Sequence, residues 1–381
     1  MANNNENKIL NVPHLRFPEF TGEWESFKLT ELGKFIGGGT PSSSNLSFWA
    51  GSIPWISSSD IKEDSINNIS ISRYITEEAI EKSTTKYCPA PVILIVSRVG
   101  VGKVALSYTS LCTSQDFCNI IEIKCHPVFL SYNLLRTMKR KSREVQGTSI
   151  KGITSDELQK IRVFIPQDKD EQNKISNILT LLDERIATQN KIIEKLQSLI
   201  KGIAQHCIKE STSGNTYVKL GDICQITTGK LDANAQVDNG IYPFFTCAEQ
   251  PFKIDSFAFD TEALLISGNG ANLGYINYYK GKFNAYQRTY VLDLFSENIQ
   301  YIKWALKVLL PKRIAIEKSS SNTPYIVLST LTDLRLPIPC KSKQSFIANL
   351  MQSLERKLSN QIAQYDSYNY LKQYLLRQMF I

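Results

Sequence analysis

Apolar residues recur at alternating intervals of four and three along two long stretches of the chain. In the first stretch the positions are Ile175, Leu179, Leu182, Ile186, Gln189, Ile193, Leu196, Ile200, Ile203 and Cys207. The same spacing 172 positions later selects Ile347, Met351, Leu354, Leu358, Gln361, Tyr365, Tyr368, Lys372, Leu375 and Met379. A spacing of this kind, kept over about five heptads, is typical of helices that pair in a coiled coil. The pattern predicts two matched helices, and we call these positions the seam.

The residues in front of each helix repeat as well. Residues 147–166 align without gaps to 320–339, and the two segments end in IRVFIP (161–166) and LRLPIP (334–339). A proline in this place suits the exit of a strand. Further upstream, residues 92–106 resemble 263–276, where a buried-strand pattern is broken by a Gly-rich turn. LGKFIGGGTP (32–41) and LGDICQITTG (220–229) begin the two copies. The chain is therefore predicted to run globule, helix, globule, helix, as an internal repeat.

The order of these parts constrains how the helices pair. If they pair with each other and the globules lie at opposite ends, the helices must run antiparallel. A helix of roughly 36 residues is about 54 Å long. Gln189, the only polar seam residue of the first helix, coincides with Gln361 of the second. Antiparallel pairing would bring these amides close enough to hydrogen-bond and to fix the alignment of the helices.

Composition agrees with a soluble globular protein. A chain of 381 residues suits two or three domains, and 42% of the residues are hydrophobic and 21% charged. We expect no membrane span, because no apolar run reaches about 18 residues. The polar start, MANNNENK, lacks the apolar region of a secretory signal, so a cytoplasmic protein is expected. The eight cysteines form no C-x-x-C pair and there are three histidines, so neither a disulfide framework nor a metal site is expected.

Two short motifs suggest enzymatic chemistry without meeting its requirements. RVGVGK (98–103) lacks the spacing of a phosphate-binding loop, and valine follows its lysine. NTPY (322–325) differs from the [ND]-P-P-[YF] signature of adenine methyltransferases at its second position and falls within the repeated loop. We therefore expect neither nucleotide binding nor methyl transfer by this chain, and no catalytic residues.

Basic residues cluster at corresponding places of the two copies, within a net charge of +8. The first cluster lies on a helix expected to begin near Tyr132 and consists of Arg136, Lys139, Arg140, Lys141 and Arg143. The second consists of Lys303, Lys307, Lys312, Arg313 and Lys318. A basic run is often a solvated helix face, but its recurrence favours contact with the phosphates of a nucleic acid.

Sequence-specific reading of DNA requires side chains with directional donors and acceptors. Such side chains lie on and around the Gly-rich turns. The candidates in the first copy are Thr40, Ser42, Ser43, Ser57, Ser58, Ser59, Ser97, Arg98, Lys103, Gln115, Thr148, Ser149 and Lys151. Those in the second are Ser267, Asn269, Asn272, Gln287, Arg288, Ser320, Ser321 and Asn322. The alternative for each is a polar side chain in a solvated hairpin loop.

The chain resembles the specificity subunit of type I restriction–modification enzymes over essentially its whole length. The resemblance rests on VPHLRFPEFTGEWE (12–25), FWAGSIPWISSSDI (48–61), the SRVGVGK turn and the duplicated unit that ends in the seam helices. It implies an α+β fold with two homologous α/β target recognition domains separated by two long antiparallel coiled-coil helices, related by a pseudo-twofold repeat. The implied divisions are recognition domains at 1–168 and 211–341, a central spacer helix at 169–210, and a C-terminal spacer helix at 342–381.

The resemblance also implies a function and partners. Each recognition domain would read one half of a bipartite, asymmetric target in double-stranded DNA, and the chain itself would not be catalytic. Two methyltransferase subunits and two restriction (motor-nuclease) subunits would join it, and S-adenosylmethionine, ATP and Mg would belong to those partners. Outward charges on the helices would contact the partners or pair in solvent. They are Asp183, Glu184, Arg185 and Lys191 in the first helix and Glu355, Arg356 and Lys357 in the second. The alternative functions are a coiled-coil scaffold that binds proteins only, and an enzyme that acts alone.

Overall fold

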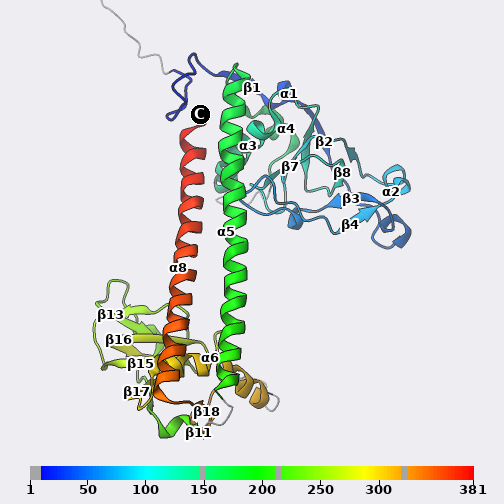
Figure 1. Cartoon of the computed structure of the whole chain (residues 1–381). Coiled ribbons are helices and arrows are strands. Elements are labelled where there is room, and N and C mark those ends of the chain that lie inside the picture. Colours follow the sequence, from blue (N-terminus) through cyan, green and yellow to red (C-terminus); the bar gives the residue numbers. More distant parts are fainter. Residues whose placement is uncertain (1–9, 146–151, 212–215, 319–324) are drawn as a thin grey trace, which may run out of the picture. The chain divides into compact units, whose positions relative to one another are not determined.

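The computed structural model describes residues 10–145, 152–211, 216–318 and 325–381, and the chain divides into two compact units. Unit 1 comprises residues 1–190 and 364–381, and unit 2 comprises residues 191–363. The helices α5 (Lys169–Glu210) and α8 (Lys341–Gln378) are continuous, and each contributes one part to each unit. Each unit therefore contains one globule and a stretch of both long helices (Figure 1).

Unit 1 is built on two four-stranded sheets. One has the order β2 (Lys34–Gly37), β9 (Cys118–Ile121), β6 (Val92–Ile95), β7 (Val104–Ser107). The other has the order β4 (Arg73–Ile75), β3 (Ile53–Ile56), β8 (Leu111–Thr113), β5 (Tyr87–Cys88), with β3 and β8 parallel. A further antiparallel pair, β1 (Glu25–Lys28) and β10 (Arg162–Ile165), joins the start of the globule to its end. The short helices are α1 (Leu29–Leu32), α2 (Glu77–Glu81) and α4 (Ser155–Lys160), with 3-10 turns at Leu46–Trp49 and Ser58–Asp60.

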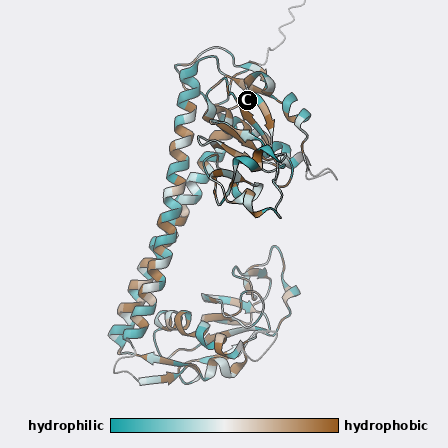
Figure 2. Ribbon diagram, turned by 90° about the vertical axis from the view of Figure 1, so that its right-hand side faces the viewer, coloured by the Kyte–Doolittle hydropathy of each residue, from teal (hydrophilic) through white to brown (hydrophobic). Residues whose placement is uncertain are grey.

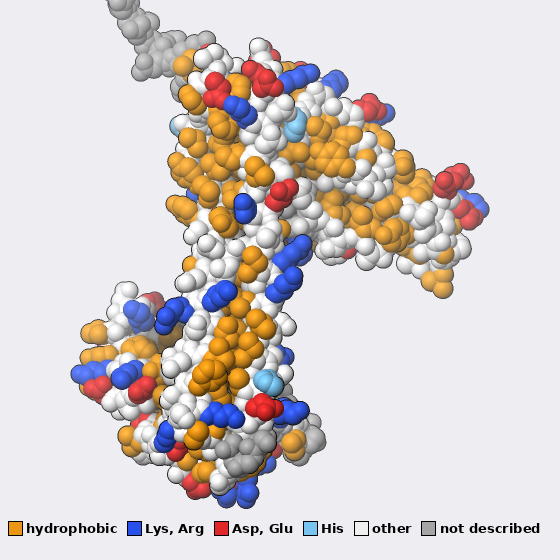
Figure 3. Space-filling view, viewed as in Figure 1, with side chains coloured by type: hydrophobic (Ala, Val, Ile, Leu, Met, Phe, Trp, Pro, Cys, Tyr) orange, Lys and Arg blue, Asp and Glu red, His pale blue; other side chains and the backbone are white. Residues whose placement is uncertain are grey.

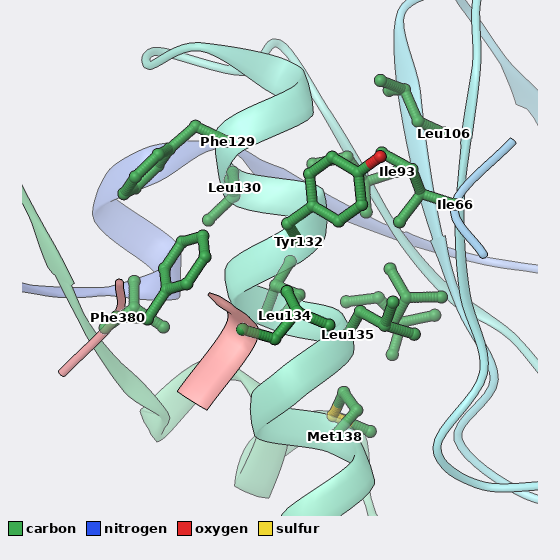
Figure 4. Close-up of a cluster of buried hydrophobic side chains, with 14 of the residues drawn as sticks. Ile66, Ile93, Leu106, Phe129, Leu130, Tyr132, Leu134, Leu135, Met138 and Phe380 are labelled. Atoms are coloured by element: carbon green, nitrogen blue, oxygen red, sulfur yellow. The ribbon is translucent and has the colours of Figure 1, made fainter. Parts of the chain in front are cut away.

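The core of unit 1 forms where α3 (Pro127–Val145) packs against the first sheet and the two long helices (Figure 4). Trp24, Phe129 and Phe380 meet there as a buried aromatic cluster, with the rings of Phe129 and Phe380 5.1 Å apart. The helix begins at Pro127, so the expected start near Tyr132 was too late. Proline favours the first helical position because its missing N–H would have no partner there.

Unit 2 repeats this plan with one larger sheet. Its order is β12 (Gln225–Thr228), β17 (Thr289–Asp293), β15 (Phe259–Ser267), β16 (Ile276–Ala285), β13 (Tyr242–Phe245), β14 (Phe252–Ile254). The pair β11 (Thr216–Lys219) and β18 (Arg335–Ile338) corresponds to β1 and β10 of unit 1. The helices are α6 (Ile299–Lys318) and α7 (Leu328–Thr332), with 3-10 turns at Leu220–Asp222 and Ala233–Ala235. The single strand β16 pairs with both β15 and β13, as β7 and β8 together pair with β6 and β3 in unit 1.

The predicted internal repeat and the antiparallel helices are confirmed. In unit 1, Leu179 and Leu182 of α5 share a core with Leu375 near the end of α8. In unit 2, Leu196 of α5 shares a core with Ile347 near the start of α8. The two helices therefore run in opposite directions in each unit. Hydrophobic residues concentrate on the strands of both units (Figure 2).

Some predictions at the level of the fold are not decided. Gln189 falls in unit 1 and Gln361 in unit 2, and their approach stays a prediction. Within the described residues, no helix has the length and apolar character needed to cross a bilayer. The same residues contain no group of three or more His, Cys, Asp or Glu side chains arranged to hold a metal ion.

Candidate nucleic-acid interface

In unit 1 the loop after β3 is held in a fixed conformation by an arginine that the sequence analysis missed. Arg73 on β4 donates to Ser57 Oγ at 2.6 Å and pairs with Asp60. Its guanidinium lies over the Trp55 ring, 4.5 Å from the ring centroid. The Ser57 and Ser59 hydroxyls lie 2.8 Å apart, so the Ser57–Asp60 loop presents an ordered row of hydroxyl groups. The register of β3 with β4 could have indicated Arg73, because it places this residue opposite Trp55.

The Gly-rich turn between β6 and β7 lies against this loop. Lys103 Nζ donates to the Ser58 carbonyl at 3.1 Å, which ties the turn to the serine loop. Gly100 and Gly102 have φ of +87° and +109°, a conformation that other residues rarely adopt. Arg98 is exposed at the start of the turn. The structure therefore brings Ser57, Ser58, Ser59, Arg98 and Lys103 together, as candidates on one surface.

The other candidates of unit 1 occupy different environments. Thr40 donates to the exposed Gln115, and Ser42 bonds to Ser44 at 2.8 Å, with Ser43 exposed beside them. Ser97 is buried and donates to the Asp116 carbonyl, so its placement favours a role in holding the turn over contact with DNA. Thr148, Ser149 and Lys151 lie outside the described residues.

The corresponding turn of unit 2 also anchors polar side chains. Asn272 donates to the Cys247 carbonyl at 3.1 Å, and the Cys247 thiol donates to Asn269 Oδ1 at 3.0 Å. The Gly268 N–H donates to the Arg288 carbonyl at 2.8 Å, which sets Arg288 beside the same turn. The sequence analysis missed Cys247, because cysteine is not among the side chains that typically read bases. The result is a cluster of amide side chains beside the main chain of Arg288, where unit 1 has hydroxyl and ammonium groups.

The remaining candidates of unit 2 divide by exposure. Gln287 is exposed beside Arg288, whereas Ser267 is buried and its N–H donates to the Tyr275 carbonyl. Burial therefore argues against a direct contact of Ser267 with DNA. Ser320, Ser321 and Asn322 lie outside the described residues, as does the side chain of Lys318.

The two basic helices differ in how far their charges are already satisfied. On α6, Lys303 is only 7% exposed and donates to Glu355 at 2.8 Å, and burial lowers its pKa more than this carboxylate raises it. Lys307 binds the same carboxylate at 3.1 Å, and Arg313 pairs with Glu317 at 2.8 Å. The buried ammonium of Lys303 argues against the predicted phosphate contact at that position. Lys312 is exposed.

On α3 the cations are more accessible. Arg140 and Arg143 are exposed, and Arg136, Lys139 and Lys141 are half-buried. Arg136 donates to the main-chain oxygen of Ile381, and Lys139 pairs with Asp64. Burial, followed by the charge of Arg140, lowers the pKa of Arg136. The two clusters thus occupy equivalent places in the repeat, but more of the cations on α3 than on α6 are accessible.

Two of the outward charges predicted for the long helices are in fact turned toward the globules. Asp183 is buried, pairs with Lys372 and accepts a hydrogen bond from Tyr132 Oη at 2.8 Å. Glu355 is half-buried beside Lys303, and although burial alone would raise its pKa, the two lysines outweigh this and lower it. The pairing of these two acids with lysines argues against the predicted contact with partners. The exposed charges that remain are Glu184, Arg185, Lys191, Arg356 and Lys357.

Comparison with known proteins adds an independent line of evidence. Residues 21–198 and 212–365 match the family model described as "Type I restriction modification DNA specificity domain". The chain is 26% identical to the MjaIX specificity subunit of Methanocaldococcus jannaschii, over 89% of this chain and 88% of that protein. A 137-residue segment is 44% identical to the EcoDI specificity subunit of Escherichia coli, but it spans only 36% of this chain and 30% of that subunit.

A solved structure shares the fold. The type I restriction–modification S subunit from M. genitalium superposes with a TM-score of 0.66 at 19% identity, over 97% of this chain and 99% of that one. The duplicated sheets and the paired helices described above thus recur in that protein.

Proposed function

The chain belongs to the type I restriction modification DNA specificity family, and from this premise we propose how it works as a DNA-specificity subunit. Each unit reads one half of a bipartite target in double-stranded DNA. The chain is not catalytic; it brings a target adenine to two methyltransferase subunits, which bind S-adenosylmethionine. Two restriction subunits with ATP and Mg complete the nuclease. Because its target is chromosomal or invading DNA, the complex acts in the cytoplasm.

One observation supports this proposal above the others: the same Gly-rich turn carries an anchored polar cluster in both units. In unit 1 the anchor is the bond from Lys103 to Ser58, and in unit 2 it is the bond from Asn272 to Cys247. Anchored donors lose little entropy on binding, which favours specific readout over adaptable contact. The clusters differ in chemistry, so the two half-sites they read differ in sequence.

The long helices offer a surface for the methyltransferase subunits. On α5, Ile178, Leu181, Ile192 and Leu199 follow a second heptad spacing outside the seam, and Leu199 is 54% exposed. Beside Leu199 lies a shallow groove of about 510 Å³ that also involves Gly202, Ile203 and His206. Figure 3 shows hydrophobic side chains gathered along the stretch of the long helices that belongs to unit 2. We call these four α5 residues, with Leu371 and Tyr374 of α8, the outer stripe.

The repeat makes this surface double. Leu371 lies 172 positions after Leu199, in the equivalent place on α8 in unit 1, and is 44% exposed. An exposed apolar patch is typical of a protein interface. An exposed leucine at the equivalent position of each unit fits two copies of the same partner, as a pair of methyltransferase subunits requires.

Reconstitution tests the proposal directly. The full chain is measured for binding to duplex DNA, alone and with its cognate methyltransferase subunits, at two salt concentrations, and the methylated adenines are mapped by sequencing. We expect sequence-specific binding that weakens steeply with salt, and methylation of a bipartite site only when both components are present. If the chain were a scaffold that binds only proteins, the amount of DNA bound would not depend on its presence. Methyl transfer by the isolated chain would contradict a non-catalytic role.

A further inference from the structure

A cationic cavity of about 240 Å³ lies in unit 1 between α3 and the last turn of α8. Its apolar floor is made by Leu135 and Leu376. Five cationic side chains and one carboxylate line it: Arg136, Lys139, Arg140, Arg143, Arg377 and Asp64. Four of the cations come from the basic run on α3, whereas Arg377 comes from the other end of the sequence.

The cavity holds more positive charge than its surroundings neutralise. Asp64 pairs with Lys139, and its main-chain oxygen accepts a hydrogen bond from Lys372. Across the residues that the structure describes, Arg140, Arg143 and Arg377 have no hydrogen bond or ion pair. Burial is the main cause of the lowered pKa of Arg136, and the neighbouring charge of Arg140 adds to it. An anion entering the cavity would therefore meet free guanidinium donors.

The end of α8 that carries Arg377 is held in place by its neighbours. Leu375 and Leu376 of α8, and Met379 and Phe380 directly after it, are all at most 7% exposed, so this end of the helix is fixed to the core of unit 1. Figure 4 shows Phe380 against α3, close to Phe129. Arg377 is thus carried by a fixed helix end, which places its side chain among those that line the cavity.

The cavity also adjoins the candidate reading surface of unit 1. A Cβ atom at Gly102 of the Gly-rich turn would lie 3.1 Å from Ser142 Oγ on α3. Ser142 directly precedes Arg143, so the turn that carries Arg98 and Lys103 touches the helix that lines the cavity. Asp64 follows the Ser57–Asp60 loop in the chain. A duplex lying on these loops would have its backbone next to the cavity.

We propose that this cavity takes one backbone phosphate of the half-site read by unit 1, and that Arg377 is a DNA-contacting residue supplied by the C-terminal helix. The inference rests on the proposed function of the chain as a DNA reader. The planar guanidinium groups match phosphate oxygens in a paired geometry, and they do so without regard to sequence. An acidic segment of a protein partner would find the same charges, but the contact between α3 and the Gly-rich turn favours DNA.

Arg377→Gln in the full complex with the methyltransferase subunits tests the site. The variant should bind cognate DNA several-fold more weakly at about 0.15 M salt, and the slope of log affinity against log salt should become shallower by about 0.9, since one phosphate contact is lost. The methylated sequence should not change. Arg143→Gln should act in the same direction. Lys160→Gln removes an exposed charge at the end of α4 in the same unit, outside the cavity, and should leave both quantities at their normal values.

A second measurement identifies the phosphate. Single phosphates of the target are replaced by neutral methylphosphonates, one at a time, across the half-site of unit 1. One replacement should weaken binding of the normal complex by several-fold and have no further effect on the Arg377→Gln complex, because both changes remove the same contact.

The possible outcomes separate the two proposals. If Arg377→Gln binds DNA as Lys160→Gln does, the cavity does not hold DNA. The same conclusion follows if every methylphosphonate replacement that weakens DNA binding by the normal complex also weakens binding by the Arg377→Gln complex. If the variant fails to retain the methyltransferase subunit, the cavity holds a protein partner and the inference is wrong. Absence of specific binding by the unaltered complex would instead refute the proposed function. A melting temperature equal to that of the unaltered chain excludes misfolding as the cause.

Discussion

At the scale of single residues, a buried ion pair joins the long helices to each other and to the globule of unit 1. Lys372 of α8 is 2% exposed and binds Asp183 of α5, while Tyr132 of α3 donates to the other carboxylate oxygen. Burial, then the nearby Asp183 carboxylate, raises the pKa of Tyr132, so this hydroxyl stays a donor. The equivalent acid of unit 2, Glu355, is neutralised by lysines of α6 instead. The acidic position is retained in both copies, but its partner comes from a different element.

Removing one member of this pair should be costly. Lys372→Met leaves the Asp183 carboxylate buried with one hydroxyl donor, and we expect a loss of about 3–5 kcal/mol in the free energy of unfolding. Adding Asp183→Asn should recover part of that loss, because a neutral amide can still accept the hydrogen bond from Tyr132. Urea unfolding at pH 7 measures both changes. Lys357→Met, at an exposed site on the same helix, is the control and should stay within about 0.5 kcal/mol. Equal effects of the two lysine substitutions would contradict the argument.

The sequence could not reveal this pair. Lys372 occupies a seam position, but Asp183 lies one position beyond the seam residue Leu182 and reads as an exposed charge. Heptad spacing describes only the pairing of two helices, and the side of α5 that carries Asp183 is covered by a third element, α3. Ser97, Ser267 and Lys303 show the same limitation. Their residue types suggest DNA contact, whereas burial depends on packing between segments far apart in the chain.

At the scale of elements, the long helices were predictable because their pattern is local and regular. The seam residues from Ile175 to Leu182 are buried, as are Ile347 and Met351. The sheets were less predictable. Unit 1 has two strands, β7 and β8, where unit 2 has the single strand β16, and this difference depends on pairing partners that are distant in sequence. Hydrophobic residues outside the seam are a second notable feature of the long helices. A helix that pairs with only one neighbour does not need such residues for that pairing.

The outer stripe should therefore be required for partner binding and not for folding. Leu199→Glu and Leu371→Glu each place a charge at the centre of one proposed docking patch. Each should reduce the number of methyltransferase subunits retained from two to one, and the double variant should retain none, while the melting temperature stays close to normal. Gln197→Glu on the opposite side of α5 adds the same charge at an exposed position and serves as the control. Stoichiometry is read from the mass of the purified complex. Retention of both subunits by the double variant would place the docking surface elsewhere.

At the scale of the whole molecule, the chain crosses from one unit to the other within α5 and within α8. Each globule packs on a stretch of both helices and has its own core, so its polar turn is positioned by contacts inside its own unit. A substitution in one turn therefore has no direct structural route to the other. Specificity for the two halves of a DNA target should be separable within a single chain.

This separability can be tested with one amide in each unit. Gln115 accepts a hydrogen bond from Thr40 and leaves its amide N–H groups free to donate to a base, while Asn272 is anchored beside Cys247 in unit 2. Gln115→Ala should relax recognition in one half of the target, and Asn272→Ala should relax recognition in the other half, each by about 1–3 kcal/mol at the affected base pair. Mapping methylated adenines across a genome gives both halves and the spacing between them in one measurement. The spacing should not change, and Asn234→Ala, at an exposed site of unit 2 away from the turn, should alter neither half. If either substitution changed both halves together, the two units would not act as independent readers.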